Sequence, residues 1–369
     1  MKSKFLEAAR STWHVSARSL YSVRLALRGL RLAPSREARL CYANVLSALG
    51  ARRFGGFGKI QDLVKHFPEC TNEFNILYMV SSARHRFADV WLRAARRMGA
   101  RIVWNQNGVG YPAWAGSRYA KINEPLAELL HGSDHVIYQS EFCKRCSDLF
   151  LGKFSGSSTV IYNSIDTQLF RCAEVPPPLD PVRLIVLGSH HHSYRVLGAL
   201  QSLRYMLDQG ASCALCIAGR LLWHGAAAEV KQTIGRLGLT HHVTLVPEYT
   251  SEGAALLLQQ SHILLHLQFQ DACPTTVIES LACGVPVVAS DSGALPELVY
   301  PDRGVLISVP QDWEHEHVPE SEKVGEAVLK IIPKWHAYHQ AARKGAEDRF
   351  KLPQWINSHQ LLFKTLLAH

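Results

Sequence analysis

The chain has 369 residues, of which 47% are hydrophobic and 19% charged, a balance that excludes a disordered or fibrous protein. At about 150 residues per domain, this length predicts two domains. No run approaches the roughly 18 apolar residues of a membrane-spanning helix, and the first residues carry no apolar stretch, so no secretory signal is expected. Nine cysteines scattered along the chain favour a reducing, cytoplasmic compartment.

The positive charge is concentrated in the first half of the chain. Residues 1–175 hold 25 Lys and Arg against 13 Asp and Glu, whereas the remainder holds 15 against 18. A basic half predicts a polyanionic partner, such as an anionic membrane surface, a phosphorylated lipid or a nucleic acid. We expect no nucleic acid, because the basic residues have no interleaved aromatic side chains and form no DNA-binding motif. Ordinary surface charge is the alternative explanation.

Residues 1–37 contain one amphipathic segment. A basic amphipathic helix of this kind either lies on an anionic membrane surface or packs its apolar side chains on the rest of the chain. The sequence leaves both alternatives open. The apolar stripe is Leu20, Val23, Leu27 and Leu30, and the arginines beside it are Arg24, Arg28 and Arg31.

From residue 38 onward, short β-rich runs alternate with amphipathic helical patterns. Such alternation predicts parallel sheets with right-handed crossovers, so the expected fold class is α/β, with two Rossmann-like domains facing a cleft. The predicted strands are Arg39–Val45, Asn75–Val80, Arg101–Trp104, His135–Tyr138, Thr159–Tyr162, Arg183–Leu187, Cys213–Ala218, Val243–Val246, Ile263–His266, Val285–Ala289 and Val305–Ile307. The clearest helices are Arg86–Met98, Val196–Gln209, Ala226–Leu237 and Thr276–Ala282.

The composition breaks most clearly at residues 174–181, which hold four prolines. Proline at this density sustains neither a helix nor a central strand, so a semi-rigid linker is predicted. We therefore expect one domain over residues 38–173 and a second over residues 182–350. The last part of the chain, residues 351–369, is predicted to be a helix that starts near Pro353 and ends at Leu367.

The most informative segment is residues 271–290. Asp271 and Glu279 are eight residues apart, and Pro274 between them suits the first turn of a helix. Both carboxylates are therefore expected near one helix N-terminus, where free N–H groups and the positive end of the helix dipole attract a phosphate. Gly284 ends this helix and leads into a buried strand.

This segment resembles the donor-binding signature of GT-B glycosyltransferases, in particular family 4, the retaining enzymes that use nucleotide sugars. The family pattern is an acid, seven residues and a glutamate, followed by Gly-x-Pro and a valine strand. The resemblance covers residues 160–369 strongly and residues 50–160 more loosely, and it implies a C-terminal helix that crosses back to the first domain. The matching residues are, in order, Asp271, Pro274, Glu279, Gly284, Pro286, Gly293, Pro296 and Glu297.

The resemblance implies a binding site for the donor diphosphate. In the family, an arginine directly after the glycine of the first donor-domain strand and a lysine six residues further on hold this group. Gly188 is the corresponding glycine, Ser189 takes the place of the arginine and Arg195 that of the lysine. The three histidines at residues 190–192 are expected to compensate in part for the lost cation.

The resemblance also implies roles for the two carboxylates. Glu279 is expected to accept hydrogen bonds from the ribose hydroxyls, and Asp271, one methylene shorter than the usual glutamate, from hydroxyls of the donor sugar. Arg195 and the N–H groups near Thr275 and Thr276 are expected to stabilise the departing diphosphate. The expected donor contacts are Gly188, Ser189, Gly219, Arg220, Pro274, Thr275, Thr276 and Glu279.

The first domain is expected to present the acceptor. Gly55 and Gly56 lie in a glycine-rich turn that, in the family, lets the backbone approach the donor phosphates and the acceptor. Gln106 and Asn107 end a predicted strand where many family members carry a histidine near the reacting centre, and Tyr111 follows shortly after. The expected catalytic residues are Arg195, Asp271 and Asn107.

No metal or cofactor is expected. The chain has no Asp-x-Asp motif, and Cys213 and Cys216 lie at an odd separation in a predicted strand, so their side chains point to opposite faces. The resemblance implies a metal-independent hexosyltransferase of polysaccharide biosynthesis that acts on a glycan or lipid-linked acceptor in the cytoplasm or on the cytoplasmic face of a membrane. A catalytically silent nucleotide- or glycan-binding subunit of the same fold and a nucleotide-sugar epimerase are the alternatives.

Overall fold

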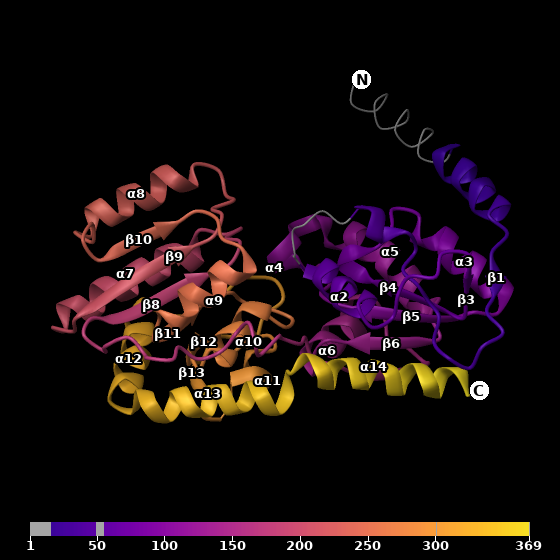
Figure 1. Ribbon diagram of the computed structural model, residues 1–369. Coiled ribbons are helices and arrows are strands. Elements are labelled where there is room, and N and C mark those ends of the chain that lie inside the picture. The colour runs from indigo at the N-terminus through magenta and orange to yellow at the C-terminus, as the bar shows by residue number, and fades with distance from the viewer. Residues whose placement is uncertain (1–15, 49–54, 300, 369) are drawn as a thin grey trace, which may run out of the picture.

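The computed structural model describes residues 16–48, 55–299 and 301–368, and within them a five-stranded and a six-stranded parallel sheet lie side by side (Figure 1). A further parallel sheet has two short strands, β1 (Arg31–Leu32) and β3 (Glu73–Phe74). The expected α/β class with two Rossmann-like domains is confirmed. The first sheet has the spatial order β2 (Leu40–Cys41), β4 (Ile76–Val80), β5 (Arg101–Gln106), β6 (His135–Tyr138) and β7 (Ser157–Val160). The second has the order β10 (Val243–Val246), β9 (Cys213–Ala218), β8 (Val182–Leu187), β11 (Ile263–His266), β12 (Val287–Ser290) and β13 (Gly304–Ile307).

Both faces of the second sheet are covered by helices. Alternate residues of β8 enter different core clusters: Leu184 and Val186 face one side, whereas Ile185 and Leu187 face the other. Burial on both faces explains why the strands of this sheet are nearly continuous apolar runs. The helices are α7 (Tyr194–Asp208), α8 (Ala226–Arg236), α9 (Ser251–Gln259), α10 (Thr275–Ala282), α11 (Leu295–Val299), α12 (Ser321–Ile331) and α13 (Trp335–Arg349).

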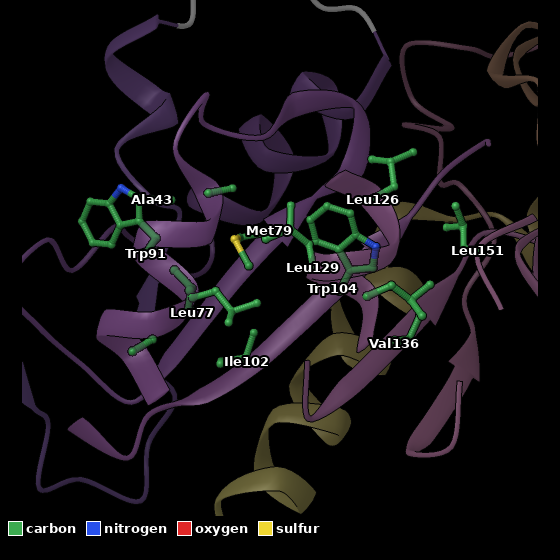
Figure 2. Packing of buried hydrophobic residues seen from close by; sticks show 14 of the residues in the cluster. Ala43, Leu77, Met79, Trp91, Ile102, Trp104, Leu126, Leu129, Val136 and Leu151 are labelled. Carbon is green, nitrogen blue, oxygen red and sulfur yellow. The ribbon is translucent and has the colours of Figure 1, made fainter. Parts of the chain in front are cut away.

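The first sheet has an equally buried core. Trp91 and Trp104 are fully buried in it and pack with Met79 and Leu77, as Figure 2 shows. The opposite face of the sheet is covered by the helix that contains Ile60 and by the C-terminal helix. The helices of this domain are α2 (Gly55–Val64), α3 (Ala88–Met98), α4 (Pro112–Ala115), α5 (Tyr119–His131) and α6 (Glu141–Phe150).

The last helix, α14 (Leu352–Leu367), crosses from the second domain to the first (Figure 1, yellow). Its His359 Nε2 lies 3.1 Å from the Tyr78 hydroxyl, and Arg101 Nε donates to the Leu366 carbonyl over 3.1 Å. The crossing helix implied by the family resemblance is therefore confirmed. Residues 174–181 form no helix or strand, and the predicted domain boundaries on either side of them stay predictions.

Some predicted strand bounds are wrong. The strand expected over Arg39–Val45 ends at Cys41, because Ala43 and Asn44 turn the backbone with φ values of 56° and 63°. The strand expected from Val285 begins at Val287, because the Val285 N–H still donates to the last turn of the preceding helix. The observed bounds agree with the predicted ones for the strands His135–Tyr138, Cys213–Ala218, Val243–Val246 and Ile263–His266. The other predicted elements differ from the observed ones by one or two residues at their ends, where side-chain patterns are least informative.

The N-terminal segment forms a helix over residues 16–27, and its first 15 residues, where no secretory signal was expected, lie outside the described part of the chain. The helix packs on the first domain through Leu25, which is 2% exposed, with Tyr21 and Ala17 beside it. The predicted apolar stripe is therefore not the buried face. Leu20, Val23 and Leu27 are 54%, 56% and 81% exposed.

Candidate active site

The predicted donor residues gather at one edge of the second sheet. Gly188 follows β8, Gly219 follows β9, and Asp271 lies in the loop after β11. The carboxyl ends of parallel strands meet at one edge, which is where ligands bind in open α/β sheets. The sequence therefore places these residues together through topology, although they are far apart along the chain.

Two glycines bring the backbones of β8 and β9 into close approach. Gly188 and Gly219 have φ values of 126° and 116°, and a Cβ on Gly219 would lie 1.8 Å from the Gly188 carbonyl oxygen. A Cβ on Gly188 would lie 3.7 Å from Thr276 Cγ2 and 3.8 Å from Arg195 Nη2. Both glycines are thus required by the backbone, and Gly188 lies directly beside Arg195 and the start of α10.

Arg195 is buried without an acidic partner. Its guanidinium donates to the carbonyls of Ser189 and Leu187 over 3.1 and 3.4 Å, and its Nε has no partner. Burial lowers its pKa, while the charge of Asp271 raises it. No carboxylate lies within salt-bridge distance among the residues described. A buried cation held only by neutral oxygens is a strong attractor for an anionic ligand.

His190, one of the three histidines beside Arg195, does not supply a second cation. His190 is fully buried, and its Nε2 lies 3.1 Å from the Ala218 carbonyl. Burial and the neighbouring Arg195 lower the pKa of His190 to about 3, so this imidazole is neutral at pH 7. The expected compensation for Ser189 by this histidine is wrong.

The N-terminus of α10 adds positive electrostatic potential at the edge of the second sheet where Arg195 lies. Pro274 precedes the helix as its N-cap rather than lying in the first turn as predicted, and Thr275 begins the helix. The first N–H groups of a helix have no partner inside it and, with the helix dipole, they bind anions. Thr275 is exposed and Thr276 is partly exposed, so both are accessible from solvent.

The two predicted carboxylates lie close to this edge. Asp271 and Glu279 are each partly exposed. Asp271 Oδ2 lies 3.5 Å from Nε2 of the buried His266, and a Cβ on Gly293 would lie 2.4 Å from the Asp271 carbonyl oxygen. Because Gly293 has no side chain, the backbone of the loop that carries Asp271 can lie in close contact with the turn that contains Gly293. His266 was not predicted, because a lone histidine in an apolar strand gives no signal.

In the first domain, Lys59 forms a hydrogen-bonded centre that the sequence did not predict. Its Nζ donates to the side-chain oxygens of Asn105, Asn107 and Gln139 over 3.1, 2.8 and 2.9 Å. Burial lowers its pKa from 10.5 to about 8. Three acceptors satisfy all three ammonium donors, so Lys59 fixes the orientation of three amides at the ends of β5 and β6.

The predicted acceptor residues surround this centre. Asn107 also donates from its Nδ2 to Ser82 Oγ, which in turn accepts from the Gly56 N–H over 3.1 Å. A Cβ on Gly56 would lie 2.5 Å from that hydroxyl, so this glycine allows α2 to pack against the end of β4. Gly55 has a φ of 50°, in the left-handed region that glycine tolerates.

Gln106 and Tyr111 lie deeper than Asn107. The Gln106 amide is fully buried, donates to the Gly108 carbonyl over 2.7 Å and accepts from Trp104 Nε1 over 2.7 Å. Tyr111 is 6% exposed and packs against Trp313 of the second domain with ring centroids 5.5 Å apart. Both side chains therefore shape the loop after β5.

The two halves of the site are joined by hydrogen bonds across the domain junction. The Glu297 carboxylate accepts from the N–H groups of Glu141 and Phe142 over 2.8 and 2.7 Å and from the Tyr162 hydroxyl over 2.9 Å. A carboxylate at a helix N-terminus is favoured by the dipole of that helix, here α6. The Asn163 amide donates to the Cys273 carbonyl, directly before α10, over 2.7 Å.

Within the described residues, no three or more His, Cys, Asp or Glu side chains are grouped so as to hold a metal ion. Cys213 is buried and Cys216 is partly exposed on the same strand, in agreement with side chains on opposite faces. The site thus consists of a buried arginine, a helix N-terminus, two carboxylates and a lysine-centred set of amides.

Comparison with solved structures gives the class of fold. Sucrose-phosphate synthase from Thermosynechococcus elongatus superposes with a TM-score of 0.64 at 16% identity, over 80% of this chain and 74% of that chain. HepE from Anabaena in complex with UDP-glucose superposes with a TM-score of 0.64 at 17% identity, over 86% of this chain and 90% of that chain. A glycosyltransferase from Rickettsia africae superposes with a TM-score of 0.63 at 16% identity, over 86% of this chain and 84% of that chain. The protein therefore has the GT-B fold of glycosyltransferases.

Comparison of sequences gives a family match over part of the chain. Residues 173–317, which contain the second sheet, match the family described as Glycosyl transferases group 1. A phosphatidylinositol N-acetylglucosaminyltransferase subunit from Arabidopsis thaliana is 23% identical over 219 residues, 59% of this chain and 48% of the relative. The chain thus spans about half the length of this curated relative.

Proposed function

We propose that the protein is a retaining glycosyltransferase that moves a sugar from a nucleotide-diphosphate sugar to an acceptor hydroxyl, with no metal ion. The observation that carries this proposal is the buried Arg195, which has no acidic partner in the described part of the chain and lies beside Gly188 and the N-terminus of α10. The family match of residues 173–317 and the UDP and UDP-sugar complexes of structural relatives support it.

In this proposal, the second domain stabilises the leaving group. Negative charge grows on the diphosphate as the bond to the sugar breaks, and donors already aimed at that charge lower the barrier. Arg195 and the N–H groups of Thr275 and Thr276 take this role, where one metal ion would serve in other enzymes. Glu279 binds the ribose hydroxyls, and Asp271 binds hydroxyls of the donor sugar.

The remaining predicted donor residues support these groups. Gly188 and Gly219 leave space beside the diphosphate, and the Ser189 carbonyl holds the guanidinium in place. Arg220 is exposed directly after Gly219, where it can contact the nucleotide. Pro274 sets the start of α10 and hence the direction of its free N–H groups.

In the first domain, the acceptor hydroxyl lies against Asn107 and the glycine-rich start of α2. Lys59 fixes the amide of Asn107 through a 2.8 Å hydrogen bond and so determines which atoms face the acceptor. Gly55 and Gly56 permit close approach at the same edge, and Tyr111 supports the loop. The acceptor is a glycan or a lipid-linked glycan, as in polysaccharide biosynthesis.

We also propose that the helix at residues 16–27 holds the protein on an anionic membrane surface at the cytoplasmic face. Leu20, Val23 and Leu27 are exposed on it, and Arg24 and Arg28 are exposed beside them. Each Lys or Arg near an anionic surface contributes about 1 kcal/mol. None of the described helices combines the length and hydropathy needed to cross a bilayer. We propose no nucleic-acid partner.

The test is a transfer assay with labelled UDP- and GDP-sugars and a lipid extract, run with and without EDTA. The proposal predicts turnover that EDTA does not reduce and that Arg195→Gln lowers about 10²- to 10³-fold. Nucleotide binding without turnover would instead identify a catalytically silent protein of the same fold, and interconversion of free nucleotide sugars would identify an epimerase. A loss of activity with EDTA that Mg²⁺ restores would contradict the metal-independent mechanism.

A further inference from the structure

A hollow lies in the first domain, lined by residues of the N-terminal helix, the loop after β4, α3 and α5. Its volume is about 580 Å³. Arg18 from the helix and Arg84 and Arg86 from the loop line it, with His85 between them. The donor residues described above do not contribute to it.

The hollow carries an excess of positive charge. Its two carboxylates already have arginine partners: Asp89 is bonded to Arg18 and Arg93, and Glu128 lies 3.6 Å from Arg93. Arg84 donates to the Ser81 carbonyl over 2.7 Å and has no carboxylate partner among the residues described. Arg84 is an exposed residue, although partial burial of its guanidinium lowers its pKa. Its remaining N–H groups are donors for an anion, because guanidinium groups bind phosphate oxygens with paired hydrogen bonds.

The hollow borders the acceptor half of the site. Ser82 lines the hollow, and its hydroxyl accepts hydrogen bonds from both Gly56 and Asn107. The Ser82 side chain thus lies between the arginines of the hollow and the Asn107 amide, which the proposed function places at the reacting hydroxyl. A ligand that fills the hollow extends toward Asn107 at the carboxyl edge of the first sheet.

We propose that this hollow binds a phosphate ester carried by the acceptor, so that the acceptor is an acidic molecule held by Arg84 while its hydroxyl reaches Asn107. This inference rests on the proposed glycosyl transfer and names the class of its acceptor. A lipid headgroup and a soluble phosphate ester share this chemistry. Arg18 lies on the same helix as the exposed Leu20, Val23 and Leu27, so a headgroup in a membrane surface is within reach of the hollow.

The experiment measures binding of two phosphate sources to the full chain. Glycerol 3-phosphate is titrated calorimetrically, and vesicles of phosphatidylcholine with and without phosphatidylglycerol are used in cosedimentation. The variants are Arg84→Gln, the conservative Arg84→Lys, and Arg36→Gln as a control with the same charge change at an exposed position outside the hollow. UDP titration of each variant serves as a check on the second domain.

We expect Arg84→Gln to weaken binding of at least one phosphate source about ten- to hundred-fold, the loss of a charge-assisted hydrogen bond. Arg84→Lys should recover part of it, and Arg36→Gln should leave it unchanged. Binding of vesicles alone assigns a lipid headgroup, and binding of glycerol 3-phosphate as well assigns phosphate esters in general. UDP affinity should be the same in all variants.

Equal phosphate binding by Arg84→Gln and Arg36→Gln, or no binding of either source by the wild type, would overturn the inference. These outcomes are independent of the donor reaction. If no nucleotide sugar is turned over while phosphate binding depends on Arg84, the proposed transfer fails and the phosphate site stands. If transfer to a phosphate-bearing acceptor is as fast in Arg84→Gln as in wild type, the transfer stands and the acidic acceptor is wrong.

Discussion

The two domains each bury one cation at the candidate site, and they treat it in opposite ways. In the second domain, Arg195 is held by two backbone carbonyls and keeps Nε without a partner. In the first domain, Lys59 donates all three of its hydrogens to amide oxygens. A satisfied cation organises the protein around it, whereas an unsatisfied one is stabilised when an anion arrives. This difference identifies Arg195 as a ligand-binding residue and Lys59 as a positioning residue.

The largest effect is expected at the unsatisfied cation. Arg195→Gln should lower turnover about 10²- to 10³-fold, the range observed when one donor to a developing charge is removed. Folded stability should change little or increase, because the variant removes a buried charge that has no acidic partner. Steady-state kinetics and urea unfolding of the same preparation measure both quantities. A loss of activity that parallels a loss of stability would make Arg195 a structural residue.

The next effect concerns the ribose contact in the same domain. Glu279→Gln should weaken binding of the nucleoside itself by about 1.5–3 kcal/mol, because a carboxylate accepts stronger hydrogen bonds than an amide. Calorimetric titration with uridine and guanosine checks this. Lys59→Met, in the other domain, is the matched control and should leave nucleoside affinity unchanged. If the nucleoside binds Glu279→Gln as tightly as wild type, Glu279 does not contact the ribose.

A smaller effect is expected for membrane binding by the first domain. Leu27 is 81% exposed, so Leu27→Ser leaves the fold intact but removes an apolar side chain from the proposed membrane face. Burying a leucine contributes about 1.5–3 kcal/mol, and partial insertion should make the loss of vesicle affinity about ten-fold. Cosedimentation with anionic vesicles measures it. Leu222→Ser, at a position 43% exposed in the second domain, is the control and should have no effect.

The last of these predictions tests the satisfied cation through pH. Burial lowers the pKa of Lys59 to about 8, below the ordinary value of 10.5, so between these values the unfolded chain binds a proton that the folded chain lacks. The free energy of unfolding contributed by Lys59 therefore rises with pH across this window, by at most about 1.4 kcal/mol per pH unit. Urea unfolding of wild type and Lys59→Met from pH 7 to pH 10 should show this difference. A difference that is constant with pH would show that Lys59 does not titrate in this window.

The sequence predicted the second domain better than the first for a physical reason. Three of its donor residues, Asp271, Pro274 and Glu279, lie in one local motif around a helix start, so their proximity follows from helix geometry alone. The Lys59 centre joins side chains from α2, the end of β5 and the end of β6, which only the tertiary fold brings together. A lysine four residues into an apolar helix gives no sign of the amides that it will meet.

Errors in the predicted elements have similar local causes. The strand that was expected to continue to Val45 ends early because Ala43 and Asn44 adopt positive φ values, which their side chains do not require. Leu20, Val23 and Leu27 of the predicted apolar stripe are exposed because Leu25, which lies outside the stripe, makes the buried contact. Leu30, the last residue of the stripe, is partly buried against the same core. Periodicity identified the helix correctly but did not determine which face contacts the protein.

The most direct test of the central claim compares diphosphate binding with nucleoside binding in wild type and Arg195→Gln. Calorimetric titrations with UDP, GDP and their nucleosides separate the contribution of the diphosphate from that of the base and ribose. We predict that one diphosphate binds wild type at least ten-fold more tightly than its nucleoside, and that Arg195→Gln removes this difference while nucleoside affinity is kept. If the diphosphate increases affinity over the nucleoside by the same factor in wild type and in Arg195→Gln, then Arg195 and its edge of the second sheet are not the diphosphate site.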